Sequence, residues 1–333
     1  MGKEAQNIRK EDVAPAKGNW LKKLTNSREF GIGAPLIALI IIVGILNPVF
    51  LDPENIINVL RQIAFVFIIG IAMTFILISA GLDLSVGSVL ALGGIITGMA
   101  LLANIPMWLS IILGILSGAA VGVFNGLVIT RFKIPSLIVT LGMMYFARGV
   151  VQVLTKGNPV YPLPDYFNLL GQGFIAGIPI VVIVAALLAI IAHIVLTRTA
   201  FGRAIYAVGG NAETARLSGI NVQQVTAWAY VLSGIASALT GILTAARLGS
   251  GLSNAGTGME LQVIASCIIG GTSMFGGAGS ILGTLIGAAF MAVVANGMVL
   301  LRISVYYQSM VIGAIIILAV GLDQYNRKRS GMA

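Results

Sequence analysis

Long stretches of the chain lack Asp, Glu, Lys and Arg, and the lengths of these stretches predict its elements. A helix needs about 20 apolar residues to cross roughly 30 Å of hydrocarbon. Gly31 to Leu51 is long enough for one crossing, whereas the uncharged run from Leu84 to Thr130 needs two, with a turn at Asn104 to Pro106. Applied to the whole chain, this rule predicts ten membrane helices, at residues 31–51, 59–82, 84–103, 107–130, 134–155, 177–197, 223–246, 260–273, 279–299 and 303–322. The predicted fold is an all-α polytopic membrane protein.

The segments outside the predicted helices set the orientation of the chain. They are a tail at 1–30, a loop at 197–222, a second tail at 323–333 and several short turns, around one transmembrane domain at 31–322. An even number of crossings places both tails on one side. That side carries 15 of the 20 Lys and Arg residues, so the positive-inside rule predicts that both tails are cytoplasmic.

Composition narrows the class of protein further. Hydrophobic residues are 58% of the 333 residues and charged residues only 9%, which excludes a soluble globular protein. One Cys and one His are too few for a disulfide framework or a zinc site, so we expect no bound metal. We interpret the net charge of +9 as membrane orientation, not as a nucleic-acid surface.

No group of residues predicts catalysis. No two carboxylates share a helix face, His193 and Cys267 are isolated, and a phosphate-binding G-x-x-x-x-G-K-[ST] motif is absent from the sequence. We therefore expect no catalytic residues and no cofactor on this chain, and any energy for transport must come from elsewhere.

Small residues at helical spacing predict close helix packing, because they allow the backbones of neighbouring helices to approach. They form two stripes, Gly114, Gly118, Gly122 and Gly126 in one predicted helix, and Gly279, Gly283 and Gly287 in another. An alternative is that these smooth surfaces slide against their neighbours during gating.

Two polar segments suggest roles at the cytoplasmic face. Asp83 and Ser85 come between the second and third predicted helices, where they could cap a helix or take part in gating or in contact with an ATPase. In the loop at 197–222, Asn211 is a good N-cap for a short helix over 212–217, and Gly219 could end it. The loop that contains this short helix carries few charges among its Ala, Leu and Ile residues, so the exposed surface of the helix would be unusually apolar unless a partner covers it. It is therefore either a solvated connector or a docking site for a partner.

Several motifs make the chain similar to the permease subunits of bacterial ABC sugar importers of the ribose/xylose/galactose type. The resemblance runs from about Asn47 to Asp323. Its motifs are Gly81-Leu-Asp-Leu-Ser-Val-Gly87, Ile138-Val-Thr-Leu-Gly142, Phe201-Gly-Arg203, Val208-Gly-Gly-Asn211, Arg216-Leu-Ser-Gly-Ile-Asn221, Ala246-Arg-Leu-Gly249, Gly256-Thr-Gly-Met-Glu260, Ile269-Gly-Gly-Thr-Ser273 and Tyr306-Tyr-Gln308.

The resemblance implies an ATP-driven importer of a monosaccharide in the bacterial inner membrane. Its implied partners are a second permease copy, two ATP-binding cassette subunits that bind ATP and Mg, and a periplasmic sugar-binding protein. Glu213, Ala215 and Gly219 match the E-x-A-x-x-x-G core of a coupling motif, although Thr214 stands where the motif has alanine. The segment implied to couple this chain to the ATPase contains Asn211, Ala212, Glu213, Ala215, Arg216 and Gly219.

A path for a sugar should carry modest hydrogen-bonding groups and few fixed charges. The in-helix candidates are Ser88, Asn125, Thr140, Thr244, Asn296 and Gln308. Each could instead hydrogen-bond a neighbouring helix. Two other functions stay open, an ion-coupled secondary transporter and a membrane scaffold that transports nothing. The first would need carboxylates or broken helices inside the membrane, and the predicted helices offer essentially none.

Overall fold

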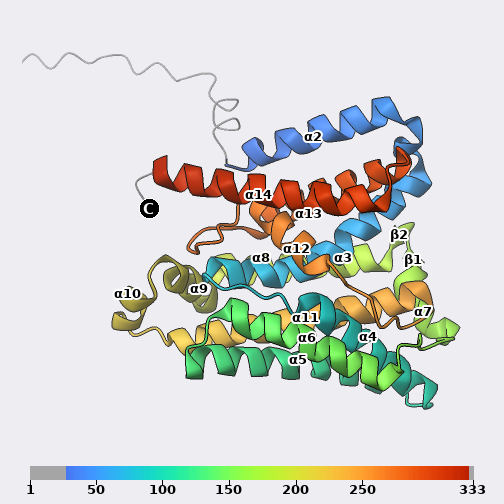
Figure 1. Cartoon of the computed structure of the whole chain (residues 1–333), viewed down its shortest axis with the longest axis horizontal. Coiled ribbons are helices and arrows are strands. Elements are labelled where there is room, and N and C mark those ends of the chain that lie inside the picture. The colour runs from blue at the N-terminus through green and yellow to red at the C-terminus, as the bar shows by residue number, and fades with distance from the viewer. Residues whose placement is uncertain (1–27, 330–333) are drawn as a thin grey trace, which may run out of the picture.

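The structure is a computed structural model that describes residues 28–329. Ten helices overlap the ten predicted intervals, and they run roughly side by side (Figure 1). They are α2 (Arg28–Leu46), α3 (Pro53–Ile78), α4 (Val86–Leu102), α5 (Met107–Phe132), α6 (Ser136–Thr155), α8 (Ile180–Arg198), α11 (Val222–Leu248), α12 (Met259–Ile269), α13 (Ile281–Leu300) and α14 (Val305–Arg329). The chain is therefore a predominantly α-helical, multi-pass membrane protein.

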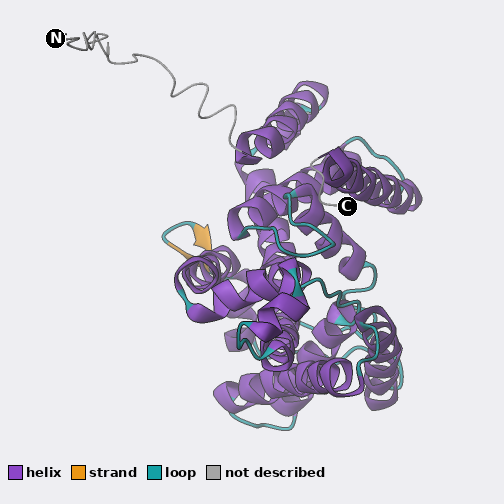
Figure 2. Ribbon diagram, turned by 90° about the vertical axis from the view of Figure 1, so that its left-hand side faces the viewer, coloured by secondary structure: helices purple, strands orange, loops and turns teal. Residues whose placement is uncertain are grey.

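Short elements lie at the two ends of the bundle. A 3-10 helix, η1 (Pro48–Leu51), follows α2, and α7 (Asp165–Gln172) precedes the hairpin of β1 (Phe174–Ile175) and β2 (Ile178–Pro179). At the opposite end, α9 (Ala200–Gly210) and α10 (Ala212–Leu217) project from the bundle (Figure 1). Figure 2 shows the two short strands, in orange, beside a structure that is otherwise helical. Except for residues 28–30, which begin α2, the predicted N-terminal tail lies outside the described residues; 323–329 of the C-terminal tail continue α14.

Six of the helices are long and apolar enough to cross a membrane: α3, α5, α6, α8, α11 and α13. Four others contain shorter apolar segments, so the count of ten crossings and the cytoplasmic tails remain predictions. The shortest of these four is α12, whose 11 residues span only about 16 Å along the helix axis. It ends before Gly270 and Gly271, and the latter has φ +81°, a backbone conformation that glycine adopts without strain.

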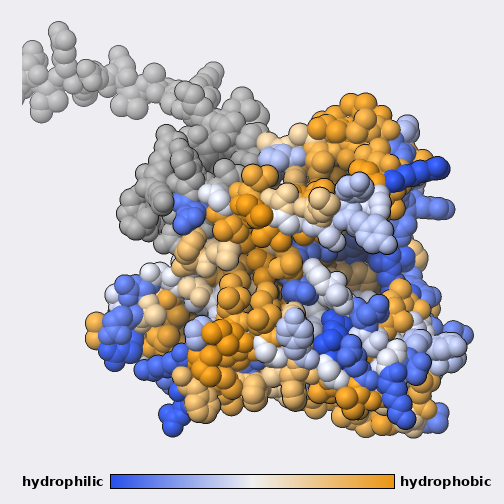
Figure 3. All heavy atoms as spheres, in the orientation of Figure 1, coloured by the Kyte–Doolittle hydropathy of each residue, from blue (hydrophilic) through white to orange (hydrophobic). Residues whose placement is uncertain are grey.

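Burial separates an inner set of helices from an outer set. α3, α4 and α11 are largely buried, whereas α5, α6 and α8 carry many exposed apolar side chains, such as Phe146, Val153 and Ile190. A soluble protein would not leave this much apolar surface in water. Hydrophobic atoms cover much of the face shown in Figure 3, as expected where a helix bundle meets lipid.

The two glycine stripes lie at close contacts with neighbouring segments. A Cβ atom on Gly118 would lie 2.2 Å from the carbonyl oxygen of Gly234 in α11, and one on Gly122 would lie 2.4 Å from that of Tyr230. Gly114 faces α4 and α11, and Gly126 faces α11. In the second stripe, Gly283 and Gly287 face the α12 segment, and Gly279 lies against Ile78 and Thr272. The glycines therefore occupy positions where any side chain would collide with a neighbour.

Candidate functional site

The short helix α10 forms a projection from one end of the bundle. Asn211 begins it, because its side chain accepts a 2.8 Å hydrogen bond from the Thr214 backbone N–H. Gly219 has φ +83° and reverses the chain after it. Arg216 donates to Glu213 through Nε at 3.0 Å, and this hydrogen bond lowers the pKa of the Glu213 carboxyl. Sequence reasoning thus located both ends of the projection.

Most of this projection is open to contact. The residues of the predicted coupling segment are exposed, including Ala212, with the exception of Ala215, which packs into the main core. Leu217 is 74% exposed, which is unusual for a leucine on a projecting helix unless a partner covers it. An apolar side chain beside a charged pair on a projecting helix is suited to docking of another protein.

The projection is firmly connected to the bundle through α9. A Cβ atom on Gly209 would overlap the carbonyl oxygen of Ile78, the last residue of α3. That same oxygen accepts a 2.9 Å hydrogen bond from the Gly277 N–H, and Tyr206 donates to the Gly279 carbonyl at 2.7 Å. A force applied at α10 would therefore reach both α3 and the segment before α13.

A buried polar cluster surrounds the turn between α3 and α4. Asp83 is 2% exposed, and its Oδ1 accepts hydrogen bonds from the Ser85 N–H at 2.9 Å and the Ser85 hydroxyl at 2.6 Å. Its Oδ2 accepts from the Ser233 hydroxyl of α11 at 2.8 Å. Asn125 of α5 donates to the Ser85 hydroxyl at 3.1 Å. The Asp83 carboxylate thus ties the turn to α11, and the Ser85 hydroxyl ties it to α5.

This cluster corrects one expectation. Asp83 does not cap α4, since Ser85 is the N-cap residue and makes no side-chain capping bond. Asp83 lies between two helices and not within one, yet it is enclosed by the bundle. The reason is that the chain from Gly81 to Ser85 is not helical, and its polar groups pair with side chains of α5, α6 and α11.

The other predicted path residues differ in their surroundings. Thr140 donates to the Ser136 carbonyl of its own helix at 2.8 Å, and Thr244 donates likewise to Thr240 at 2.7 Å. Asn296 exchanges two hydrogen bonds with Asn55 of α3, and Gln308 is half-buried in α14. The structure does not bring these four residues together around one cavity.

Ser88 has different surroundings. It is 1% exposed, its hydroxyl has no hydrogen-bond partner among the described residues, and it lines a polar cavity of about 290 Å³. The cavity lies between the first turn of α4, the middle of α6, and the segment that leads into α12. Its lining is Ser88, Met144, Tyr145, Arg148, Gln152, Ser253, Asn254, Thr257 and Glu260.

One arginine organises this cavity. Arg148 Nη1 donates hydrogen bonds of 2.8 Å to the carbonyl oxygens of both Ser253 and Ala255. The segment 249–258 is not helical, and Arg148 supplies partners to backbone carbonyls that no helix satisfies there. Gly256 and Gly258 have φ values of +71° and +81°, which lets the segment fold back and start α12 at Met259. This non-helical segment lies between the two helices predicted at 223–246 and 260–273, and the contact with Arg148 is what the sequence did not predict.

Sequence reasoning missed Arg148 and Glu260 as site residues. Both line the cavity, and Glu260 Oε1 accepts from the Gly258 N–H at 3.2 Å. A signal was present, because Arg148 is the one charged residue inside the predicted helix 134–155. A charged side chain at membrane depth is costly and usually has a function.

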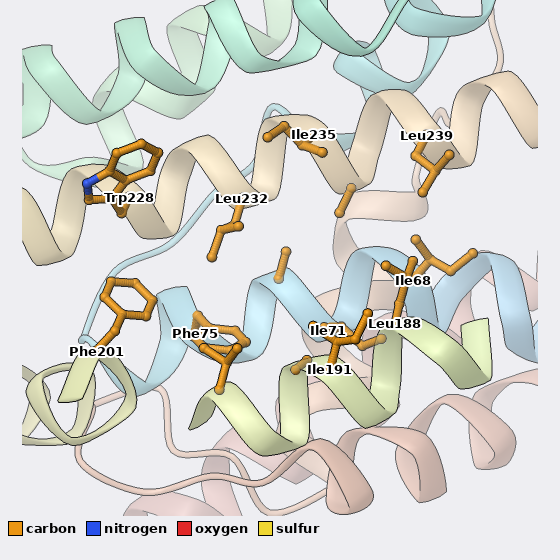
Figure 4. A pocket seen from close by; sticks show the side chains of 14 residues that line it. Ile68, Ile71, Phe75, Leu188, Ile191, Phe201, Trp228, Leu232, Ile235 and Leu239 are labelled. Carbon is orange, nitrogen blue, oxygen red and sulfur yellow. The ribbon is translucent and has the colours of Figure 1, made fainter. Parts of the chain in front are cut away.

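A second cavity, of about 480 Å³, has the opposite character. It lies between α3, α8, α9 and α11, and every side chain that lines it is hydrophobic (Figure 4). Phe75, Phe201 and Trp228 lie at one end of it. A ligand rich in hydroxyl groups would lose its hydrogen bonds to water in this space and gain none. This cavity is therefore unsuited to a polar solute.

Together, the bundle, its exposed projection and its polar cavity define the class, a polytopic membrane protein built for transport. The chain belongs to the family described as branched-chain amino acid transport system / permease component, whose model matches residues 55–320. The family that the motifs predicted is confirmed, and the chain is a permease subunit of a transport system.

Relatives cover almost its whole length. The ribose import permease protein RbsC of Bacillus subtilis (strain 168) is 44% identical over 297 residues, which cover 89% of this chain and 91% of the relative. The D-allose transport system permease protein AlsC of Escherichia coli (strain K12) is 38% identical, with 89% and 91% covered. The L-arabinose ABC transporter permease protein AraH of Azospirillum brasilense is 35% identical, with 95% and 93% covered. No solved structure matches the chain significantly.

Proposed function

We propose that this chain is the membrane-spanning subunit of an ATP-driven importer that moves a monosaccharide, ribose or a related simple sugar, across the bacterial inner membrane. The observation that carries the proposal is the 44% identity to a ribose import permease over nearly the full length of both chains. Relatives named for allose, arabinose and xylose support the class of solute, and leave the individual sugar to experiment.

The proposed energy source is ATP hydrolysis on separate subunits. Two ATP-binding cassette subunits would bind ATP and Mg and dock on α10 of two permease copies, and a periplasmic protein would deliver the sugar at the opposite end. The firm connection from α10 through α9 to Ile78 supports this proposal, because it gives the docking helix a mechanical link to the bundle. Movement of that link would alternate the access of the sugar path between the two sides.

An ion-coupled secondary transporter is the second candidate, and the buried Asp83 carboxylate favours it to a degree. Three protein donors already occupy that carboxylate, and it does not line the polar cavity. An ion-binding carboxylate needs access to a water-filled path, so Asp83 is better suited to holding helices together.

A reconstitution experiment distinguishes these functions. The chain is placed in proteoliposomes with the proposed ATPase subunits and sugar-binding protein, and uptake of radiolabelled D-ribose, D-xylose, D-allose and L-arabinose is measured. We expect uptake of at least one sugar that requires ATP and Mg on the ATPase side. Uptake by the chain alone under a proton or sodium gradient would support the secondary transporter, and assembly without any uptake would support the scaffold.

A further inference from the structure

We propose that the polar cavity between α4, α6 and the segment leading into α12 is a binding site for one monosaccharide on its way through the bundle. Ser88, Arg148 and Glu260 are its principal contacts. This inference rests on the proposed function and adds the location and residues of the sugar site.

The first argument is the hydroxyl of Ser88. It is buried and has no hydrogen-bond partner within residues 28–329, yet it lines the cavity. A buried hydroxyl without a partner costs free energy, and proteins retain few of them. Serine at this position is explained if a ligand in the cavity supplies the missing partner.

The second argument is the chemistry of the other lining groups. Arg148 contacts two carbonyl oxygens through Nη1 alone, and a guanidinium has five N–H donors, so donors remain for a ligand. Glu260 Oε1 accepts one backbone N–H, which leaves acceptor capacity on the carboxylate. Gln152, Asn254 and Thr257 add groups that can donate and accept. A sugar offers both functions at each hydroxyl, and this lining matches them.

Charge and size point in the same direction. Arg148 and Glu260 carry opposite charges and make no ion pair within 4 Å in the described part of the chain, so the cavity is neutral overall while both groups stay available. A neutral polyol suits such a site. The volume of about 290 Å³ lies at the small end of the range of roughly 300–1,000 Å³ for small-molecule sites. One monosaccharide is the appropriate scale.

The position of the site also fits a transport step. The non-helical segment 249–258 places backbone carbonyls and the start of α12 beside the cavity, and transporters bind solutes with helix starts and non-helical backbone of this kind. The start of α4 packs so closely here that a Cβ atom on Gly87 would lie 2.3 Å from the Gly256 carbonyl oxygen. A shift of this contact would change the shape of the cavity and so the hold on a bound sugar.

The test compares Ser88→Ala with Ser237→Ala in the complete transporter. Ser237 is also a buried serine whose hydroxyl has no partner among the described residues, but it does not line the cavity. We expect Ser88→Ala to lower the rate of D-ribose uptake roughly two- to tenfold, the effect of one neutral hydrogen bond, with an unchanged melting temperature. Ser237→Ala should leave uptake unchanged. Equal uptake in the wild type and both variants would overturn the site.

Glu260→Gln supplies a second measurement. It keeps an acceptor for the Gly258 N–H and removes the charge, so we expect uptake to fall roughly ten- to hundredfold while the binding protein still stimulates ATP hydrolysis. Glu54→Gln, an exposed carboxylate in the first turn of α3, is the control and should change nothing. If Glu260→Gln proves unstable, the serine pair still decides the question.

Different results would disprove the proposed function and the proposed sugar site. If the wild-type transporter imports none of the four sugars, the proposed function is wrong. If it imports D-ribose and neither cavity variant affects the rate, the function stands and the site is wrong. Uptake of leucine, a zwitterion that Arg148 and Glu260 could also bind, with loss in both cavity variants, would overturn the assignment to a sugar.

Discussion

The carboxylate of Asp83 and the hydroxyl of Ser233 are joined by a 2.8 Å hydrogen bond, although 150 residues separate them in the chain. The bond connects the turn after α3 to the middle of α11. Both side chains are shielded from solvent, Ser233 completely. In a low-dielectric interior such a bond is strong, and an unpartnered charge is costly. The pair therefore fixes the turn against the inner helix.

We predict that Ser233→Ala destabilises the bundle by about 1.5–3 kcal/mol, because Asp83 loses one donor to its charged group. The measurement is the melting temperature of the purified chain in detergent. Ser237→Ala is the matched control, since Ser237 lies one turn further along α11 and its hydroxyl bonds to nothing in the described residues. Equal melting temperatures for the two variants would show that the bond to Asp83 contributes nothing.

The contact between α5 and α11 gives a second prediction. Gly118→Ala places a methyl group 2.2 Å from the Gly234 carbonyl oxygen, so the helices must separate, at a cost of about 1–3 kcal/mol or more. Gly118→Leu should prevent assembly of the bundle. Gly142→Ala in α6 is the control, because nothing lies within 4 Å of the added atom and alanine favours the helix. A stable Gly118→Leu chain that has lost transport alone would indicate a sliding surface instead.

Sequence patterns predicted the helices well, because an uncharged run of about 20 residues has few stable alternatives in a membrane. They also located α10, since the N-cap Asn211 and the stop at Gly219 are local signals. The glycine stripes were visible for the same reason. Each of these features depends on residues that are close together in the chain.

The polar cavity could not be predicted in this way. Its lining comes from three separate segments, and Arg148 reaches a loop more than 100 residues away. The path residues were chosen by type alone, and type does not distinguish Ser88, which faces the cavity, from Thr244, which bonds to its own helix. The non-helical segments near Asp83 and Gly256 fall between predicted helices, but the side chains that contact them from distant helices could not be predicted.

A third prediction concerns α10. In Glu213→Lys, two cations would face each other at positions 213 and 216, near the start of a helix where positive charge is unfavourable. We expect sugar uptake to fall roughly tenfold or more while the ATPase subunits continue to hydrolyse ATP, since the docking surface is altered and the bundle is not. Gly219→Asp should act similarly, because its φ of +83° strains any side chain.

The control for α10 is Gln224→Lys, which introduces the same cationic side chain at an exposed position in the first turn of α11. Uptake and ATP hydrolysis should match the wild type. Co-purification of the ATPase subunits separates uncoupling from loss of assembly. Normal uptake in both Glu213→Lys and Gly219→Asp would remove α10 from the coupling mechanism.

The last prediction concerns Asn296, which the sequence offers either as a path residue or as a contact between helices. Its side chain donates to Asn55 Oδ1 at 2.8 Å and accepts from Asn55 Nδ2 at 3.1 Å, so the two amides satisfy each other across α3 and α13. Asn296→Leu leaves both groups of the Asn55 amide without that partner, and we expect a loss of about 1–3 kcal/mol. Adding Asn55→Leu removes the unsatisfied amide, although the Phe50 carbonyl then also loses a donor. The double variant should therefore lose less free energy of unfolding than the two single variants combined. Melting temperatures of the four chains in detergent complete the cycle, and D-ribose uptake by each is measured alongside. Loss of uptake by Asn296→Leu at an unchanged melting temperature would instead place this residue on the path.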